Sequence, residues 1–202
     1  MSGDARGAYA DAATWFVSLV RQVDGRWDEP GLGSWSVRDL VGHTSRALLT
    51  VESYLRAGPG PVEAPSAVDY FVRSREALAD AEAVAERGRQ AGAALGDDPP
   101  AAVAVIAERV LALVAAAGVD DYAATPVGDM WLADYLPTRT FELVVHGCDL
   151  AAACGLPDDV PVPAAAEAGG LATGLAARDG NAADLLLAAT GRRPLPPGFT
   201  VL

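Results

Sequence analysis

Apolar residues recur at three- and four-residue steps along most of the chain, which is the spacing that places them on one face of an α-helix. This spacing predicts helices over about 8–24, 37–56, 66–95, 99–117, 134–154, 163–178 and 181–190. Strand-like alternation is scarce, and residues 118–133 read as an irregular connection. The pattern therefore predicts an all-α fold, a four-helix bundle with additional C-terminal helices.

Capping signals define the start of two helices. Ser36 precedes the second helix, Asp39 follows three positions later, and Trp35 and Leu40 occupy the two positions of a hydrophobic staple. Asp98 stands before two prolines, which favour the first helical positions. The sequence shows no 20–50-residue repeat, no long linker and no clear boundary of a second domain. We therefore expect one domain over 1–202, with a core at about 8–155 and a helical extension at about 156–202.

Composition narrows the chemistry. The chain carries 27 acidic residues against 15 basic ones, all of them Arg, for a net charge of −12. This balance argues against nucleic acid and anionic membranes as partners. The absence of Lys excludes Schiff-base and P-loop lysine chemistry. With only two histidines in the chain, any imidazole chemistry must use His43, His146 or both.

Cysteine use and hydropathy predict a cytoplasmic protein. Cys148 and Cys154 face about 120° apart around one helix, so neither a disulfide nor a metal pair is expected. The N-terminus lacks a basic segment followed by an apolar run, as a signal peptide would have. The most apolar stretch, 101–117, contains Glu108 and Arg109, so we interpret it as a core helix rather than a membrane span.

Four polar side chains share one face of the helix at 134–154. Glu142 and His146 are one helical turn apart, and Arg139 and Asp149 fall in the same ~80° sector. The rest of this helix is mostly Leu, Val, Phe and Ala. Polar groups gathered on one face of an otherwise apolar helix indicate that this face has a functional role.

His43 lies at the edge of the apolar stripe of the helix at 37–56, with Arg46 on the same side. Together with Glu142 and His146, it forms a set of two imidazoles and one carboxylate. Such a set suits a divalent first-row metal and leaves positions open for water or substrate. Spacing alone leaves an alternative, in which the histidine is a hydrogen-bonded core-edge residue and the Glu–His pair is a helix-surface interaction.

The same segments resemble a known family. GSWSVRDLVGHTSRAL (33–48) and LPTRTFELVVHGCDLAAACGL (136–156) look like the two signatures of the mycothiol-dependent maleylpyruvate isomerase family, in the DinB-like superfamily. The ending TGRRPLPPGFTVL is also similar to members of this family. The resemblance covers about residues 10–202.

The resemblance implies an up-down-down-up four-helix bundle in which His43, Glu142 and His146 bind a metal, typically zinc. It also implies mycothiol as a thiol cofactor whose sulfur, bound at the metal, becomes the nucleophile. Arg46 and Arg139 are candidates to contact an anionic substrate, or else form ion pairs with nearby acids. Asp149 is a candidate to hold the second ring nitrogen of a ligand histidine, or else is solvated or paired with Arg.

One feature departs from the family. The full isomerase carries a C-terminal α/β domain, whereas only 48 residues follow Cys154 here, too few for that domain.

From the candidate ligands and the resemblance together, we expect a metal-dependent, mycothiol-using isomerase or S-transferase that acts on a small carboxylate or electrophile. We also expect a homodimer, as in related bundles. The alternative is a helical ligand-binding or dimerisation module with a vestigial or absent metal site. A cavity that opens onto the three candidate ligands would favour the enzyme.

Overall fold

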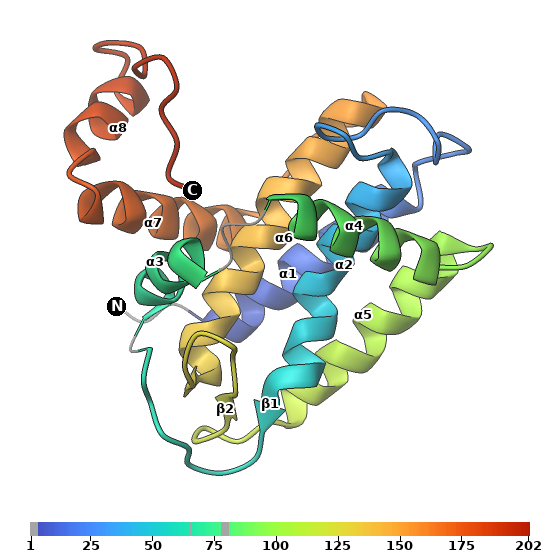
Figure 1. The fold of residues 1–202 in the computed structure, drawn as a ribbon, viewed down its shortest axis with the longest axis horizontal. Helices are drawn as coiled ribbons and strands as arrows, with labels where there is room; N and C mark the ends of the chain where they lie inside the picture. The colour runs from blue at the N-terminus through green and yellow to red at the C-terminus, as the bar shows by residue number, and fades with distance from the viewer. Residues whose placement is uncertain (1–3, 65, 78–80) are drawn as a thin grey trace.

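The computed structural model describes residues 4–64, 66–77 and 81–202, and it confirms a predominantly all-α fold (Figure 1). The helices are α1 (Ala5–Val20), α2 (Val37–Tyr54), α3 (Ala67–Ala77), α4 (Ala81–Ala94), α5 (Pro99–Ala116), α6 (Leu132–Cys154), α7 (Val162–Arg178) and α8 (Ala182–Ala189). The strands are β1 (Leu55–Arg56), β2 (Tyr122–Ala123) and β3 (Met130–Trp131). They form one small antiparallel sheet in the order β1-β2-β3.

Four helices form the bundle. α1 and α2 each pack against both α5 and α6. The small sheet brings together the end of α2, the end of α5 and the start of α6. Arg6, near the start of α1, donates hydrogen bonds to the carbonyls of Ala117 and Gly118 just after α5. The starts of α1 and α6 therefore lie at the same end as the ends of α2 and α5, which is an up-down-down-up arrangement.

The bundle interior is apolar and well filled. Burying each large aliphatic or aromatic side chain contributes about 1.5–3 kcal/mol relative to its exposure. The largest side chains with almost no exposed surface come from α1, α2, β3, α6 and α7: Tyr9, Phe16, Leu19, Leu40, Leu48, Met130, Leu132, Tyr135, Leu136, Leu143, Leu150 and Leu175.

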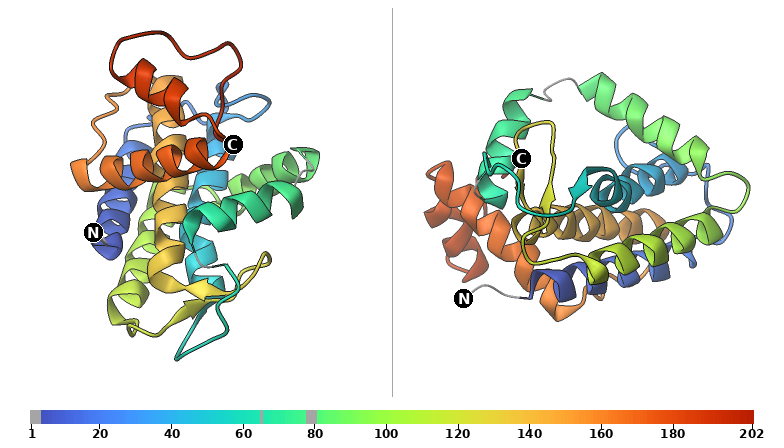
Figure 2. Two further views of the ribbon diagram at one scale, coloured as in Figure 1. Left: turned by 90° about the vertical axis from the view of Figure 1, so that its left-hand side faces the viewer. Right: turned by 90° about the horizontal axis from the view of Figure 1, so that it is seen from below.

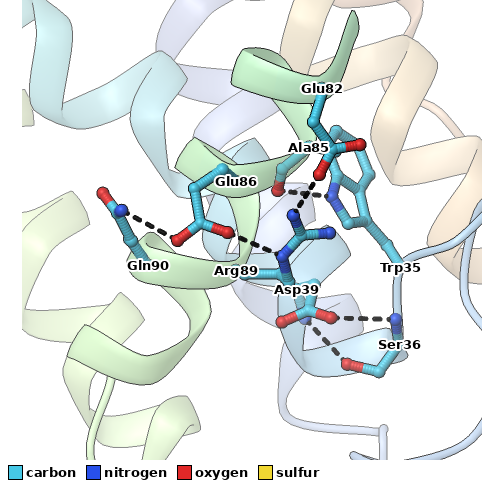
Figure 3. Close-up of polar contacts among 8 residues, drawn as sticks. All are labelled: Trp35, Ser36, Asp39, Glu82, Ala85, Glu86, Arg89 and Gln90. Carbon is cyan, nitrogen blue, oxygen red and sulfur yellow. Dashed lines mark hydrogen bonds and ion pairs between the residues drawn. The ribbon is translucent and has the colours of Figure 1, made fainter.

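The start of α2 confirms the predicted capping signal. The Ser36 hydroxyl accepts from the Asp39 amide at 3.2 Å, and the Asp39 carboxylate accepts from the Ser36 amide at 3.1 Å (Figure 3). The two bonds satisfy backbone donors that a helix start leaves unpaired, and a cap of this kind is worth about 1 kcal/mol. Asp98 caps α5 as predicted, by accepting from the Ala101 amide.

The prediction of one helix over 66–95 was wrong. Two helices occupy this range: α3 packs against α6 and α7, whereas α4 packs against α2. The two run in different directions (Figure 2, right). Their junction at 78–80 lies outside the described residues. Ala, Glu and Arg favour a helix throughout this stretch, so the sequence carries no sign that its two halves have different packing partners.

The C-terminal segment packs on the bundle. α7 contacts α6 and α1, and α8 contacts α7 and lies to one side of the bundle (Figure 1). Arg75 of α3 forms an ion pair with Asp179 at 2.9 Å and also donates to the carbonyl of Val201. Cys148 and Cys154 are free thiols, as predicted.

Within the described ranges, α5 is the one helix whose length and composition would let it cross a membrane, and 28% of it is buried. Val103, Ala107, Val110 and Val114 form its buried stripe against the bundle. Arg109 pairs with Glu52 on the neighbouring helix α2. These contacts are those of a bundle helix, so nothing here indicates a membrane protein.

Candidate metal centre

The polar stripe on α6 forms the base of the site. Nε2 of His146 lies 3.3 Å from Oε2 of Glu142, and Nδ1 lies 3.0 Å from Oδ2 of Asp149. The side chains of His146 and Glu142 are 17% and 22% exposed, so both groups are largely withdrawn from water. Asp149 thus contacts His146, and the imidazole is held from both of its nitrogens.

α2 brings His43 to the same place. One ligand atom from each of His43, Glu142 and His146 lies within 4.8 Å of the other two. The two imidazole rings meet edge to face, with centroids 4.9 Å apart and planes at 84°. Ligand atoms around a tetrahedral zinc are roughly 3.4 Å apart. Small side-chain adjustments therefore suffice to close the three groups around an ion.

Burial disfavours the charged form of all three groups, and neighbouring charges and hydrogen bonds determine the direction in which each pKa finally shifts. Burial, followed by repulsion from His146, lowers the pKa of His43 to about 4. Burial opposes ionisation of Glu142, but the His146 hydrogen bond and the charge of Arg139 outweigh it and lower this pKa to about 2. Burial also opposes the charge on His146, but Asp149 and Glu142 raise its pKa to about 9. A cation bound by all three must displace the His146 proton.

The chemistry of these donors fits a divalent metal. Nδ1 of His43 is buried and has no hydrogen-bond partner among the described residues. Buried polar atoms in proteins normally have a partner, so this imidazole has the surroundings of a ligand rather than of a hydrogen-bonded core residue. Two imidazoles and a carboxylate also match the donor sets of catalytic zinc sites, which leave a further position for water or substrate.

A cavity of about 440 Å³ adjoins the site. His43 and Glu142 border it, whereas His146 is not among its lining residues. Its walls come from α2, α3, α4, α6 and the loop before β3. The other lining residues are Arg46, Ala47, Thr50, Tyr54, Tyr70, Phe71, Ser74, Val84, Arg87, Pro126, Val127 and Arg139.

Arg46 and Arg139 both line this cavity. Arg139 is 8% exposed, and its guanidinium lies 5.3 Å from the ring of Tyr70 and 5.1 Å from that of Tyr135. Its described hydrogen bonds go to the hydroxyls of Thr138 and Tyr70. The expected alternative of an ion pair between Arg139 and a nearby acid therefore does not appear among the described contacts.

Sequence reasoning missed the aromatic and basic wall that α3 and α4 contribute. Tyr70, Phe71 and Arg87 line the cavity, and single residues of these types within a helical stretch carry no signal of a site. It also placed Trp35 in a staple and in the family signature without foreseeing its contact with His43, whose ring lies 4.4 Å away. Tyr70, Phe71 and Arg87 lie beside the trio of His43, Glu142 and His146 because α3 packs against α6 and α4 packs against α2. Spacing along the chain does not reveal this packing.

The fold and the trio define a helical bundle with a candidate divalent-metal site between two of its helices. The sequence model of the family described as the mycothiol maleylpyruvate isomerase N-terminal domain matches residues 9–151, more than half of the chain. The protein belongs to this family, as the two signatures predicted. The matched range includes His43, Glu142 and His146 and ends before α7. No curated protein and no solved structure matches the chain.

Proposed function

We propose that the protein is a metal-dependent enzyme that uses mycothiol as a thiol cofactor in an isomerisation or thiol-transfer reaction. The observation that carries the proposal is the convergence of His43, Glu142 and His146 beside a cavity. Membership of a family whose description names mycothiol supports the choice of thiol.

His43, Glu142 and His146 would hold the metal, for which zinc suits the nitrogen and oxygen donors. When bound, the metal would act as a Lewis acid that lowers the pKa of a coordinated thiol toward neutrality. The chain's own part is to orient the ligands. Asp149 accepts from Nδ1 of His146 and so directs the other ring nitrogen toward Glu142.

The substrate we propose is a small molecule with a carboxylate or an electrophilic centre. Arg139 is buried among tyrosines, and its described hydrogen bonds go to hydroxyls. Glu142 interacts with this charge electrostatically, but no described ion pair joins the two side chains. A buried charge without a direct ion-pair partner is costly, so an anionic group in the cavity would compensate it. Arg46, on the same wall, is the second candidate contact.

The cavity also separates this proposal from its alternative, a binding or dimerisation module with a vestigial metal site. A module that serves only packing or dimerisation needs no open space beside the metal ligands, whereas a substrate does, and His43 and Glu142 border such a space. The homodimer, the cytoplasmic location and the lack of a nucleic-acid partner stay predictions from the sequence.

A thiol titration of the cobalt-substituted protein tests the proposal. We expect mycothiol to add a strong near-ultraviolet band, because sulfur coordinated to Co²⁺ gives charge-transfer absorption. S-methylated mycothiol, which cannot form a thiolate, is the matched control and should leave that region unchanged. If free mycothiol leaves the cobalt spectrum unaltered at saturating concentration, the thiol-dependent part of the proposal is wrong.

Replacing Asp149 tests how His146 is oriented. We expect Asp149→Ala to weaken zinc binding on the order of 10- to 100-fold, because carboxylates that hold a ligand histidine typically contribute that much. Asp159→Ala removes the same charge from an exposed position after α6 and serves as the control. Competition with a chromophoric chelator measures both affinities, and equal values for the two variants would contradict the assignment.

A further inference from the structure

The two histidines of the site are held by different means. Both nitrogens of His146 have protein partners, Asp149 and Glu142. Nδ1 of His43 is buried without a hydrogen-bond partner among the described residues. The ring of His43 instead packs against the indole of Trp35, with centroids 4.4 Å apart and planes tilted by 33°. The indole of Trp35 is therefore a described contact that restrains the plane of the His43 ring.

The indole of Trp35 is itself held in place by α4. Its Nε1 donates to the carbonyl of Ala85 at 3.0 Å, and the residue is only 9% exposed (Figure 3). Gly88, one turn further along α4, leaves the room that the indole fills. A Cβ at this position would lie 2.7 Å from Cε2 of Trp35. The ring is thus confined both by a hydrogen bond and by the surface of α4.

The backbone of Trp35 is also fixed. Its amide donates to the carbonyl of Leu32, and its carbonyl accepts from the amide of Gly31. The capping box of Ser36 and Asp39 follows directly and fixes the start of α2 (Figure 3). A continuous series of contacts therefore runs from α4 through Trp35 and His43 to His146.

We propose that Trp35 is a positioning residue for metal binding, which sets the orientation of the His43 ring as Asp149 does for His146. The inference rests on the proposed metal site. A histidine side chain turns freely about two bonds, and holding it in one orientation in advance removes that ordering cost from binding. Trp35 acts through His43 and does not line the cavity.

Two variants move the indole, and each has a matched control. Trp35→Leu removes the ring, whereas Trp27→Leu makes the same change at a half-buried tryptophan that packs against Arg38. Gly88→Ala places a methyl group against the indole, and the three atoms nearest to it all belong to Trp35. Gly169→Ala makes that change in α7, where a Cβ meets nothing within 4 Å.

Cobalt affinity and the visible cobalt spectrum are the readouts, because both report ligand geometry and neither requires turnover. They are measured at a temperature where circular dichroism shows each variant folded. We expect Trp35→Leu to weaken Co²⁺ binding on the order of 10- to 100-fold, the range for residues that orient a ligand. We expect Gly88→Ala to weaken it less and to shift the spectrum, and both controls to match the wild type.

The results of these measurements distinguish a positioning role of Trp35 from simple packing. Cobalt affinities and spectra of Trp35→Leu and Gly88→Ala equal to those of their controls would show that Trp35 is packing alone. If Trp35→Leu does not fold, the comparison of Gly88→Ala with Gly169→Ala decides in the same way. If the wild-type protein binds no cobalt, the proposed function fails first and this inference with it.

Discussion

His146→Ala is expected to abolish metal binding. Its imidazole lies between Glu142 and Asp149 and against the ring of His43, so its removal takes away one of three ligands and the contact that links the others. Two remaining protein ligands rarely hold zinc. Isothermal titration with Zn²⁺ measures the effect, and we expect no saturable binding by the variant at concentrations that saturate the wild type.

Cys148→Ala is the control for this variant. Cys148 lies on the same helix, and its thiol is half-buried outside the trio. The control should bind zinc as the wild type does. Unchanged zinc affinity in His146→Ala would show that the ligand set is wrong, whatever the fate of the control.

Gly42→Ala is expected to produce a large loss of stability. A Cβ on Gly42 would lie 2.1 Å from the amide nitrogen of Gly92 and 2.4 Å from its Cα, so α2 and α4 touch backbone to backbone. A methyl group there cannot be relieved by a side-chain rotation and must push α4 away. We expect the free energy of unfolding to fall by about 1–3 kcal/mol, as for other overpacked sites.

Urea denaturation measures that change, with Gly169→Ala as the control. Gly169 also lies within a helix, but a Cβ there meets nothing within 4 Å. Alanine favours a helix over glycine by about 1 kcal/mol, so the control should be as stable as the wild type or more so. A Gly42→Ala variant that gains stability in the same way would show that α2 and α4 do not pack this closely.

Helix limits were predictable from the sequence where the chain carries a cap. Ser36 and Asp98 each accept a backbone hydrogen bond at the start of a helix, and α6 ends at Gly155 with a left-handed backbone at φ 59°. These are local signals, set by residues three or four positions apart. They place the start of α2, the start of α5 and the end of α6 within about two residues.

The site was only partly predictable. Helical periodicity places Glu142, His146 and Asp149 on one face of α6, and the structure brings them into contact. Helical spacing placed His43 at the inward edge of α2, but it left open whether this histidine is a metal ligand or a core-edge residue, and the family resemblance favoured the ligand. Its contact with this stripe depends on how α2 packs against α6. The partners of Arg139 were left open, because the contact with Tyr70 depends on the packing of α3 against α6, although Tyr135 lies one turn away on the same helix.

The break between α3 and α4 shows the limit of pattern reasoning. The stretch is rich in strong helix formers on both sides of residues 78–80, so local propensity predicts continuity. What separates the helices is that α3 finds its partners on α6 and α7 and α4 on α2. The cavity wall and the support behind Trp35 both depend on this division, and for that reason they were not foreseen.

Metal analysis of the purified protein tests the central claim most directly. The protein is incubated with excess Zn²⁺, passed through a desalting column and assayed for zinc and protein. Binding by His43, Glu142 and His146 predicts about one zinc per chain. Less than about a tenth of an equivalent after this treatment would contradict the metal site and the function built on it.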